Sequence, residues 1–193
     1  MIFILGGGPG LLKQPYQQLS NRRCIAVNNS YRIAPWSEAV WFGDVKWWDW
    51  HQLEVLASRI PIATCCENSK LEQWKGSHQI LFYNRDRERR FGISQRDGFV
   101  SWNKSSGASA INLAYYMGAR TIVLIGFDMR PVKGMKNWHD DHLEKPGLRP
   151  YFRHLKCFPA IKRDADELGL TILNATPGSA IKQFPIIDLK EVL

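Results

Sequence analysis

The sequence predicts an α/β fold of the Rossmann-like type, in which a mostly parallel sheet carries helices on both faces. Short apolar runs recur along the chain, helix patterns lie between them, and turns rich in glycine or serine lie beside two of the runs. Strands that alternate with helices are typical of a parallel sheet, because a parallel connection needs a crossover segment. A chain of 193 residues can bury one full core, so we expect a single domain over residues 1–193.

Seven apolar runs supply the predicted strands. Each run is continuously apolar rather than alternating, which is typical of strands that are buried on both faces of a sheet. The runs are MIFIL (1–5), CIAVN (24–28), AVWFG (39–43), IPIATC (60–65), QILFY (79–83), TIVLIG (121–126) and LTILN (170–174).

Helix patterns are expected at 46–59, 106–118 and 155–168, and the last of them stops at Gly169. Between these elements lie two long polar segments, 84–104 and 130–150. The second segment follows the carboxyl end of the TIVLIG strand, which is the edge where ligands bind in open α/β sheets. We therefore predict a lid over the ligand, formed by residues from about 130 to 154.

Composition excludes several classes of protein. No apolar run approaches the roughly 20 residues that a membrane-spanning helix needs, and MIFIL is too short for a signal peptide, so we expect a cytoplasmic protein. The 4 cysteines lack the spacing of a zinc site or a disulfide framework and are predicted to be buried thiols. Adjacent Trp47 and Trp48 should not both face the core. The tryptophan-rich first half is expected to fill the core and to make a subunit contact, and an aromatic patch for a ring-shaped ligand or a partner is the alternative.

The net charge of +8 indicates an anionic partner. Between Arg130 and Arg163 there are nine lysines and arginines against three acidic residues, so the excess lies next to the predicted ligand edge. A phosphate-binding lid explains this excess as well as a nucleic-acid surface does. Because no helix-turn-helix or zinc-finger spacing is present, nucleic-acid binding is the weaker alternative.

Two turns are candidate phosphate sites. The first follows the first strand and consists of Gly6, Gly7, Gly8, Pro9 and Gly10. Glycine amides can approach a phosphate without hindrance from a Cβ atom, although this turn is neither G-x-G-x-x-G nor a P-loop and can also be a plain strand-to-helix turn.

The second turn, Ser105, Ser106 and Gly107, opens a helix. Serine is a good N-cap, and free N–H groups together with the helix dipole favour an anion there, although simple capping is the alternative. We expect both turns to face one cavity at the carboxyl edge of the sheet.

Polar residues that directly follow buried strands point toward the ligand crevice in this architecture. Asn28 and Asn29 follow the second strand, and Asp44 follows the third. An asparagine at this edge can contact a base or a ribose, and Asp44 can hold a hydroxyl group or a cation. Turn formation is the competing explanation for each of the three.

Further candidates for chemistry lie in and around the lid. Asp128 closes the TIVLIG strand and can bind a sugar hydroxyl or magnesium, or orient the lid. His139 and His142 have acidic neighbours and can ligate a metal if they are helical, with Asp44 and Asp128 as further ligands. His154 is expected to open the last helix, to stay neutral next to basic residues, and to act as a base. The candidate catalytic residues are therefore His154, His139 and Asp128.

Taken together, these motifs resemble a known family. GGGPGLL is similar to the GxGPSL turn of the bacterial sialyltransferases of the Campylobacter type, and to the related 6-hydroxymethylpterin diphosphokinase-like proteins. The resemblance continues in the same order over nearly the whole chain, and GFDM followed by histidines also resembles small phage and prophage proteins. The matching segments are AVNNSY, AVWFGD, the helix from Ser106 to Gly118, IVLIGFD, His154 and NATPGSAIKQF.

The resemblance implies a Rossmann-like domain that binds a nucleotide or nucleotide sugar. The glycine turn, Asn28 and residues 105–107 would hold the nucleotide, and His154 would deprotonate the acceptor hydroxyl. Lysines and arginines of the lid would stabilise the departing phosphate without metal. Two positions depart from the family: Gly10 replaces a serine, and Asp44 lies where the sialyltransferases have asparagine.

Three functions follow from this resemblance. The first is a glycosyltransferase-like enzyme that uses a nucleotide-activated sugar, with His154 as base. The second is an ATP- and Mg-dependent pyrophosphokinase-like transferase, with Asp44 and Asp128 near the metal. The third is a non-catalytic nucleotide-binding protein of a phage, in the host cytoplasm. The expected partner is a small-molecule nucleotide donor; the acceptor stays open, and a homo-oligomer is an option.

Overall fold

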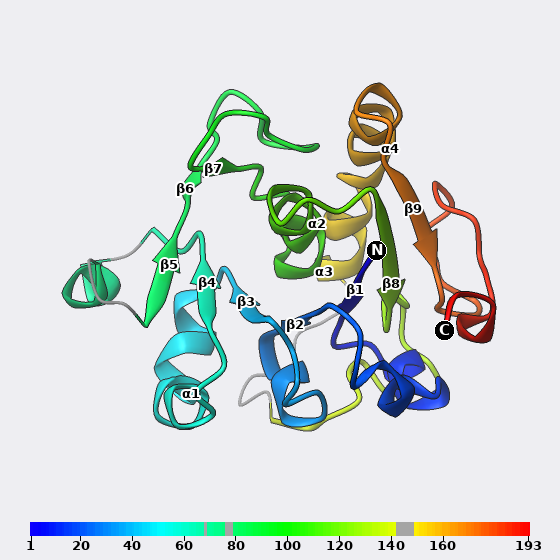
Figure 1. The fold of residues 1–193 in the computed structure, drawn as a ribbon, viewed down its shortest axis with the longest axis horizontal. Helices are drawn as coiled ribbons and strands as arrows, with labels where there is room; N and C mark the ends of the chain where they lie inside the picture. The colour runs from blue at the N-terminus through cyan, green and yellow to red at the C-terminus, as the bar shows by residue number, and fades with distance from the viewer. Residues whose placement is uncertain (68, 76–78, 142–148) are drawn as a thin grey trace.

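The computed structural model describes residues 1–67, 69–75, 79–141 and 149–193. Seven strands form one sheet in the order β5-β4-β3-β2-β1-β8-β9, and all of its pairings are parallel (Figure 1). Each predicted apolar run forms one of these strands, which confirms the predicted fold class. The strands are β1 (Ile2–Leu5), β2 (Cys24–Val27), β3 (Ala39–Phe42), β4 (Ile62–Thr64), β5 (Ile80–Phe82), β8 (Thr121–Ile125) and β9 (Thr171–Asn174).

The strand order explains where a ligand can enter. From β1 the chain builds the sheet outward through β2, β3, β4 and β5, and then it returns to place β8 and β9 on the other side of β1. The crossover connections on the two sides of β1 therefore diverge. This divergence opens a crevice at the carboxyl ends of the central strands, where ligands of doubly wound sheets bind.

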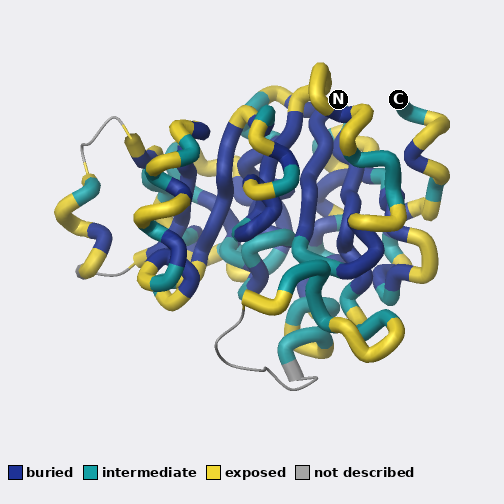
Figure 2. Tube along the Cα trace, turned by 90° about the horizontal axis from the view of Figure 1, so that it is seen from below, coloured by how far each residue is buried: buried dark blue, intermediate teal, exposed yellow. Residues whose placement is uncertain are grey.

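Helices cover both faces of the sheet. Alternate residues of β1 point to opposite sides, so that Ile2 and Ile4 pack with α2 and α4, whereas Phe3 and Leu5 pack beneath the short 3-10 helices near the N-terminus. Figure 2 shows the resulting buried layer between the more exposed outer segments. The α-helices are α1 (Val45–Ala57), α2 (Ser106–Tyr116), α3 (Arg149–Leu155) and α4 (Phe158–Glu167), and the 3-10 helices are η1 (Pro9–Lys13), η2 (Tyr16–Leu19), η3 (Asn28–Arg32), η4 (Ser69–Trp74) and η5 (Leu189–Val192).

The helix predicted at 155–168 corresponds to α4, and it is preceded by a separate helix, α3, that the sequence did not predict. α3 ends at Leu155 and α4 begins at Phe158, with Pro159 in its first turn. Proline is favoured at the start of a helix, where its missing N–H costs no hydrogen bond, but it disrupts a helix interior. His154 therefore lies in the last turn of α3, and the prediction that it opens a helix is wrong.

The polar segment 84–104 also contains structure that the sequence did not suggest. Its ends pair as two short parallel strands, β6 (Asn84–Arg85) and β7 (Phe99–Val100). The side chain of Asn112 on α2 holds this segment, because its Oδ1 accepts hydrogen bonds from the backbone N–H groups of Ser94 and Ser101 at 2.7 and 3.0 Å.

The first half of the chain buries more aromatic surface than expected. Trp47 and Trp48 are 4% and 1% exposed, so the prediction that only one of them faces the core is wrong. Trp48 stacks on Phe42 with ring centroids 5.2 Å apart, whereas Trp47 meets Tyr31 edge-on. The two neighbours point in different directions, but both directions lead into the core. All four cysteines are buried free thiols, as predicted.

Within the described parts of the chain, no helix has both the length and the apolar character that a membrane crossing requires.

Candidate functional site

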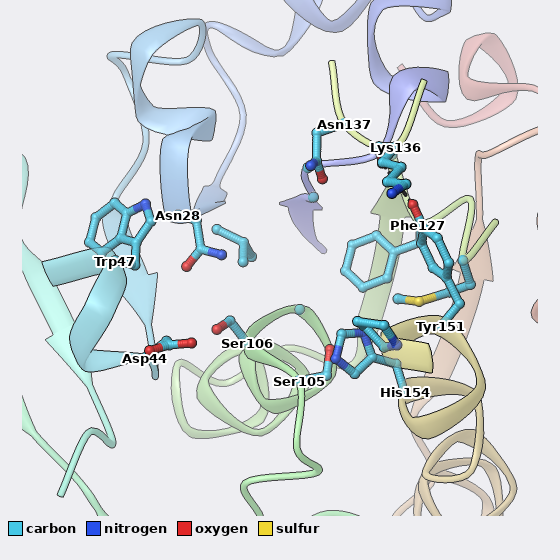
Figure 3. A pocket seen from close by; sticks show the side chains of 18 of the residues that line it. Asn28, Asp44, Trp47, Ser105, Ser106, Phe127, Lys136, Asn137, Tyr151 and His154 are labelled. Atoms are coloured by element: carbon cyan, nitrogen blue, oxygen red, sulfur yellow. Dashed lines mark hydrogen bonds between the residues drawn. The ribbon is translucent and has the colours of Figure 1, made fainter. Parts of the chain in front are cut away.

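A cavity of about 740 Å³ opens at the carboxyl ends of the central strands. Gly6, Gly7 and Gly8 line it after β1, and Ser105, Ser106 and Gly107 line it at the start of α2. The two turns therefore face one hollow, as the sequence predicted. Figure 3 shows side chains from α1, α2, α3 and the strand ends that surround this space.

The amides of the first turn are largely engaged by the protein itself. Gly6 N–H donates to Ile125 O at 2.7 Å, and Gly8 N–H donates to Gly126 O at 2.9 Å. Gly10 N–H donates to the Asp128 carboxylate at 3.0 Å. Among the described glycines of this turn, only Gly7 has an N–H without an acceptor in the protein. The expected phosphate cradle is thus mainly a clamp between β1 and β8.

The buried carboxylate of Asp128 explains the glycines of this turn. A Cβ atom at Gly8 would lie 2.2 Å from Asp128 Oδ2, and one at Gly10 would lie 2.7 Å from Oδ1. Asp128 is 3% exposed, and burial raises the pKa of its carboxyl, although the hydrogen bond from Gly10 opposes this shift. Asp128 borders the cavity, but its carboxylate is used to hold the turn. Pro9 and Gly10 are themselves buried and do not line the cavity.

The second turn keeps its outermost N–H groups open. Ser105 caps α2, because its Oγ accepts a hydrogen bond from Ala108 N–H at 3.4 Å and its carbonyl accepts one from Ser109 N–H at 2.9 Å. In the described structure, the N–H groups of Ser106 and Gly107 have no acceptor within the protein. They lie at the positive end of the helix dipole and border the cavity, which is the arrangement that binds anions.

The two asparagines after β2 have different environments. Asn28 has φ of +52° and lines the cavity, and its Oδ1 is buried without a hydrogen-bond partner. Asn29 is 1% exposed and points away from the cavity. Its Nδ2 donates to Asp141 at 3.1 Å, and its Oδ1 accepts from Trp47 Nε1. The expectation that Asn29 faces the ligand is therefore wrong, because the turn at Asn28 directs the next side chain into the protein.

Asp44 lies at the cavity with several aromatic rings around it. It caps α1 by accepting a hydrogen bond from Lys46 N–H at 2.9 Å, and Trp47, Trp50 and Trp102 line the same side. Sequence reasoning raised an aromatic ligand surface for the tryptophans of the first half but missed Trp102. Trp102 lies far from Gly43 in the sequence, but its ring packs against the Gly43 backbone in the fold. A Cβ atom at Gly43 would lie only 2.0 Å from Trp102 Cζ3.

α3 brings two side chains to the opposite side of the cavity. His154 and Tyr151 both line it, three residues apart and thus on one face of the helix (Figure 3). Burial, together with the charge of Arg153, lowers the pKa of His154 to about 4, so the imidazole is neutral at pH 7. Burial raises the pKa of Tyr151, whose hydroxyl donates to Lys136 O at 3.1 Å. Tyr151 was missed because residues 149–155 were not expected to form a helix.

The proposed metal ligands do not come together. His139 does not line the cavity, and its Nδ1 accepts a hydrogen bond from Asp141 N–H at 3.4 Å. Asp44 and Asp128 lie on different strand ends, and His142 lies outside the described residues. Over the ranges that the structure describes, no three His, Cys, Asp or Glu side chains form a group suited to a metal ion.

The charges around the cavity favour an anion. Asp44 and Asp128 are its acidic lining residues. The basic lining residues are Lys46, Lys104, Arg130, Lys136 and Arg153.

No family model matches the sequence, and no curated protein matches it. Solved structures of a bacterial sialyltransferase do match the fold. The sialyltransferase CST-II in complex with a trisaccharide acceptor and CMP has a TM-score of 0.60 and 14% identity, over 96% of this chain and 85% of that chain. CstII from Campylobacter jejuni in complex with the substrate analogue CMP-3FNeuAc has a TM-score of 0.59 and 14% identity, over the same shares. The chain therefore has a sialyltransferase-like α/β fold, in agreement with the motif resemblance.

Proposed function

We propose that this protein is a glycosyltransferase-like enzyme that uses a nucleotide-activated sugar. The observation that carries the proposal is the cavity itself, which is lined both by the open N–H groups of Ser106 and Gly107 and by the neutral imidazole of His154. A phosphate site and a proton acceptor in one cavity are what glycosyl transfer requires. The CMP-bound structures with the same fold support a nucleotide as the ligand.

The phosphate of the donor would lie at the N-terminus of α2. Lys104 precedes the Ser105 cap, and Lys136 and Arg153 line the cavity from the segment between β8 and α4. Donors that are fixed before the reaction stabilise negative charge as it develops on the leaving phosphate. This set of backbone and side-chain donors can act without a metal ion.

His154 would act as the general base. The acceptor hydroxyl oxygen forms a bond to the anomeric carbon while the bond from that carbon to the phosphate oxygen breaks. The hydroxyl proton passes to His154, and the nucleotide leaves with the electron pair of the broken bond. Because the pKa of His154 is about 4, the imidazole is available as an acceptor at every pH above about 5.

Residues from about 130 to 154 would form a lid over the bound donor. Lys136 and Asn137 line the cavity near one end of this segment, and α3 lines it near the other. Asp141 ties the segment to η3, since its carboxylate accepts from Asn29 and pairs with Arg32.

One observation favours a second candidate. Asp44 places a carboxylate in the same cavity as the phosphate site, and a carboxylate beside a phosphate is repelled unless a cation lies between them. This is the condition for an ATP- and Mg-dependent pyrophosphokinase-like transferase. The third alternative is a non-catalytic nucleotide-binding protein of a phage. Such a protein would bind a nucleotide in the same cavity without turnover.

A thermal-shift screen tests these functions. CMP, UDP and GDP, their sugar conjugates, and ATP are added with and without Mg²⁺, because a ligand at 100 times its Kd stabilises a protein by about 2.7 kcal/mol. We expect nucleotides or nucleotide sugars to raise the Tm without metal. A shift that needs both ATP and Mg²⁺ supports the pyrophosphokinase-like alternative. If no nucleotide raises the Tm under either condition, the proposed function is wrong.

The His154→Ala variant tests catalysis separately from binding. We expect nucleotide release from the donor to slow by about 10²- to 10⁴-fold, the usual contribution of a general base, while the nucleotide Kd changes little. The exposed Lys156→Ala serves as a control, because Lys156 does not line the cavity. Equal release rates in the His154→Ala variant and the wild type would contradict the assigned role. Binding without turnover in either protein would favour the non-catalytic alternative.

A further inference from the structure

The cavity has two sides with different chemistry, on either side of the α2 N-terminus (Figure 3). We call them the β3 side and the β8 side, each after one of the strands that end there. The β3 side consists of Asn28, Asp44, Lys46, Trp47, Trp50 and Trp102. The β8 side consists of Asp128, Arg130, Lys136, Tyr151, Arg153 and His154.

The two sides differ in charge. On the β8 side three cationic side chains face one carboxylate, and that carboxylate already holds Gly10 N–H. Together with the open amides of α2, this side suits the phosphate of a donor. On the β3 side the formal charges of Asp44 and Lys46 balance, and the remaining basic lining residue, Lys104, directly precedes Ser105 at the α2 N-terminus between the two sides. An anionic group would gain little by moving from the β8 side to the β3 side.

The β3 side offers ring surfaces and hydrogen-bond acceptors. Trp50 and Trp102 are partly exposed at the cavity. The Trp102 ring lies close to the Gly43 backbone, and Arg85 Cζ lies 4.4 Å from its centroid. Indole faces pack against the apolar face of a pyranose ring, and carboxylates are strong acceptors for hydroxyl groups.

Asn28 adds a second acceptor that needs a donor. Its Oδ1 is buried and lacks a hydrogen-bond partner within the protein, which is an unfavourable state for a polar atom. The side chain lies on the cavity wall beside Trp47 (Figure 3), and the broad rotation of an asparagine amide can turn the oxygen toward a ligand. A hydroxyl group on the β3 side would satisfy this acceptor.

We propose that the β3 side binds the transferred sugar and selects an uncharged, hydroxyl-rich pyranose over an acidic one. This inference rests on the proposed glycosyltransferase function. Sugar hydroxyls donate to Asp44 and Asn28, while the ring packs on Trp50 or Trp102. A sugar carboxylate would be repelled by the carboxylate of Asp44. The positive charge of Lys46 only balances the charge of Asp44 and leaves none for a second carboxylate. Asp44 is thereby a specificity-determining residue.

The test compares nucleotide sugars that share a nucleotide. Isothermal titration gives the Kd of UDP, UDP-glucose and UDP-glucuronic acid, and likewise of CMP and CMP-sialic acid, for the wild-type protein. We expect the neutral sugar of UDP-glucose to tighten binding over UDP by about tenfold or more, as hydrogen bonds to a charged acceptor do. The acidic sugars should add no affinity over the bare nucleotides.

The Asp44→Asn variant assigns the selection to the carboxylate. Asparagine caps a helix as well as aspartate does, so α1 should remain intact. We expect UDP-glucose to bind about 10-fold more weakly and the acidic sugars to bind more tightly, while the Kd of UDP stays within about twofold. Asp49→Asn is the control, because Asp49 lies on the same helix and pairs with Lys70 but does not line the cavity.

The outcomes separate this inference from the function on which it rests. If the bare nucleotides bind but CMP-sialic acid or UDP-glucuronic acid binds more tightly than its bare nucleotide, the inference is overturned and the function stands. The same holds if Asp44→Asn leaves the preference for neutral sugars unchanged. If neither UDP nor CMP binds and no other nucleotide raises the Tm, the proposed function fails and the inference fails with it.

Discussion

The two small-residue turns at the cavity have similar sequences and opposite uses. In the glycine turn, the amides of Gly6, Gly8 and Gly10 bond to the end of β8 and to Asp128. In the serine turn, the amides of Ser106 and Gly107 remain open to the cavity. The comparison teaches that small residues in a turn can serve two purposes. In the glycine turn they make room for a buried carboxylate, and in the serine turn they leave N–H groups open to a cavity.

The difference follows from how each turn satisfies its first N–H groups. The serine turn uses its own Ser105 side chain as the cap, so the remaining donors are left for a ligand. The glycine turn lies beside an acid that comes 118 residues later in the chain, and this acid takes a donor that a phosphate would otherwise bind. We therefore expect substitutions in the glycine turn to affect folding, and substitutions in the serine turn to affect the helix terminus.

The largest effect is expected for Gly8→Ala. The backbone at Gly8, with φ of −74° and ψ of 152°, allows any residue, but the added Cβ would lie 2.2 Å from Asp128 Oδ2 and 2.6 Å from Gly126 O. Overpacking of this kind against backbone and a buried carboxylate should lower the free energy of unfolding by about 3 kcal/mol. Urea-induced unfolding followed by circular dichroism measures this change.

Gly7→Ala is the matched control for Gly8→Ala. Its Cβ would meet only Asn137 Oδ1, at an ordinary contact distance of 3.5 Å. We expect a change in unfolding free energy within about 0.5 kcal/mol, as for substitutions away from special features. Equal stability of the two variants would contradict the clamp between β1 and β8.

The fold was predictable because strands that are buried on both faces leave a continuous apolar signal. Every residue of β1, β2 and β3 is buried, and each of these strands lies within a predicted run. α3 was not predictable in this way, because it begins in the polar segment 130–150, where proline and glycine indicate a loop. The charged residues at helical spacing in 155–168 correspond to α4, which begins at Phe158 with Pro159 in its first turn.

The site was predictable where the signal is local. Ser105 to Gly107, Asn28 and Asp44 reach the cavity, because each stands at the end of an element that the sequence marks. His154 also reaches it, but from the last turn of α3, a helix that the sequence did not mark. The sequence could not show that Asp128 fills the glycine turn. Nor could it show that the turn at Asn28 directs Asn29 into the core, since this depends on a left-handed backbone conformation at one residue.

A smaller effect than that of Gly8→Ala is expected at Asp128, where burial should make the free energy of unfolding depend on pH in the opposite sense to a salt-bridged acid. Burial raises the pKa of Asp128 above the value of about 3.9 that an unfolded chain has, although Gly10 N–H opposes this. Between these two values the folded state keeps a proton that the unfolded state has lost. The stability from protonated Asp128 is thus present at low pH and is lost as the pH rises through its folded pKa. The wild type should therefore lose stability relative to Asp128→Asn as the pH rises from about 4.

Asp164→Asn provides the control with the opposite sign. Burial alone would raise the pKa of Asp164, but hydrogen bonds from Ile93 N–H, Arg163 and Arg89 lower it below its usual value. Its contribution is present above about pH 3.9 and is lost as the pH falls through the folded pKa. Unfolding measured between pH 3 and 6 should give difference curves of opposite slope for the two variants. Parallel curves would mean that the folded state does not raise the pKa of Asp128.

The smallest effect is expected in the serine turn. Ser105→Ala removes the cap on Ala108 N–H and should lower the free energy of unfolding by about 1 kcal/mol, whereas Ser106→Ala, which removes no cap, should change it by less than about 0.5 kcal/mol. Thermal unfolding of the two variants measures this difference. The effect should stay well below that of Gly8→Ala, because the lost cap is a single long hydrogen bond of 3.4 Å, whereas a Cβ atom at Gly8 would overlap Asp128 Oδ2 at 2.2 Å. A Ser105→Ala loss as large as that of Gly8→Ala would mean that both turns hold the fold and that neither is reserved for a ligand.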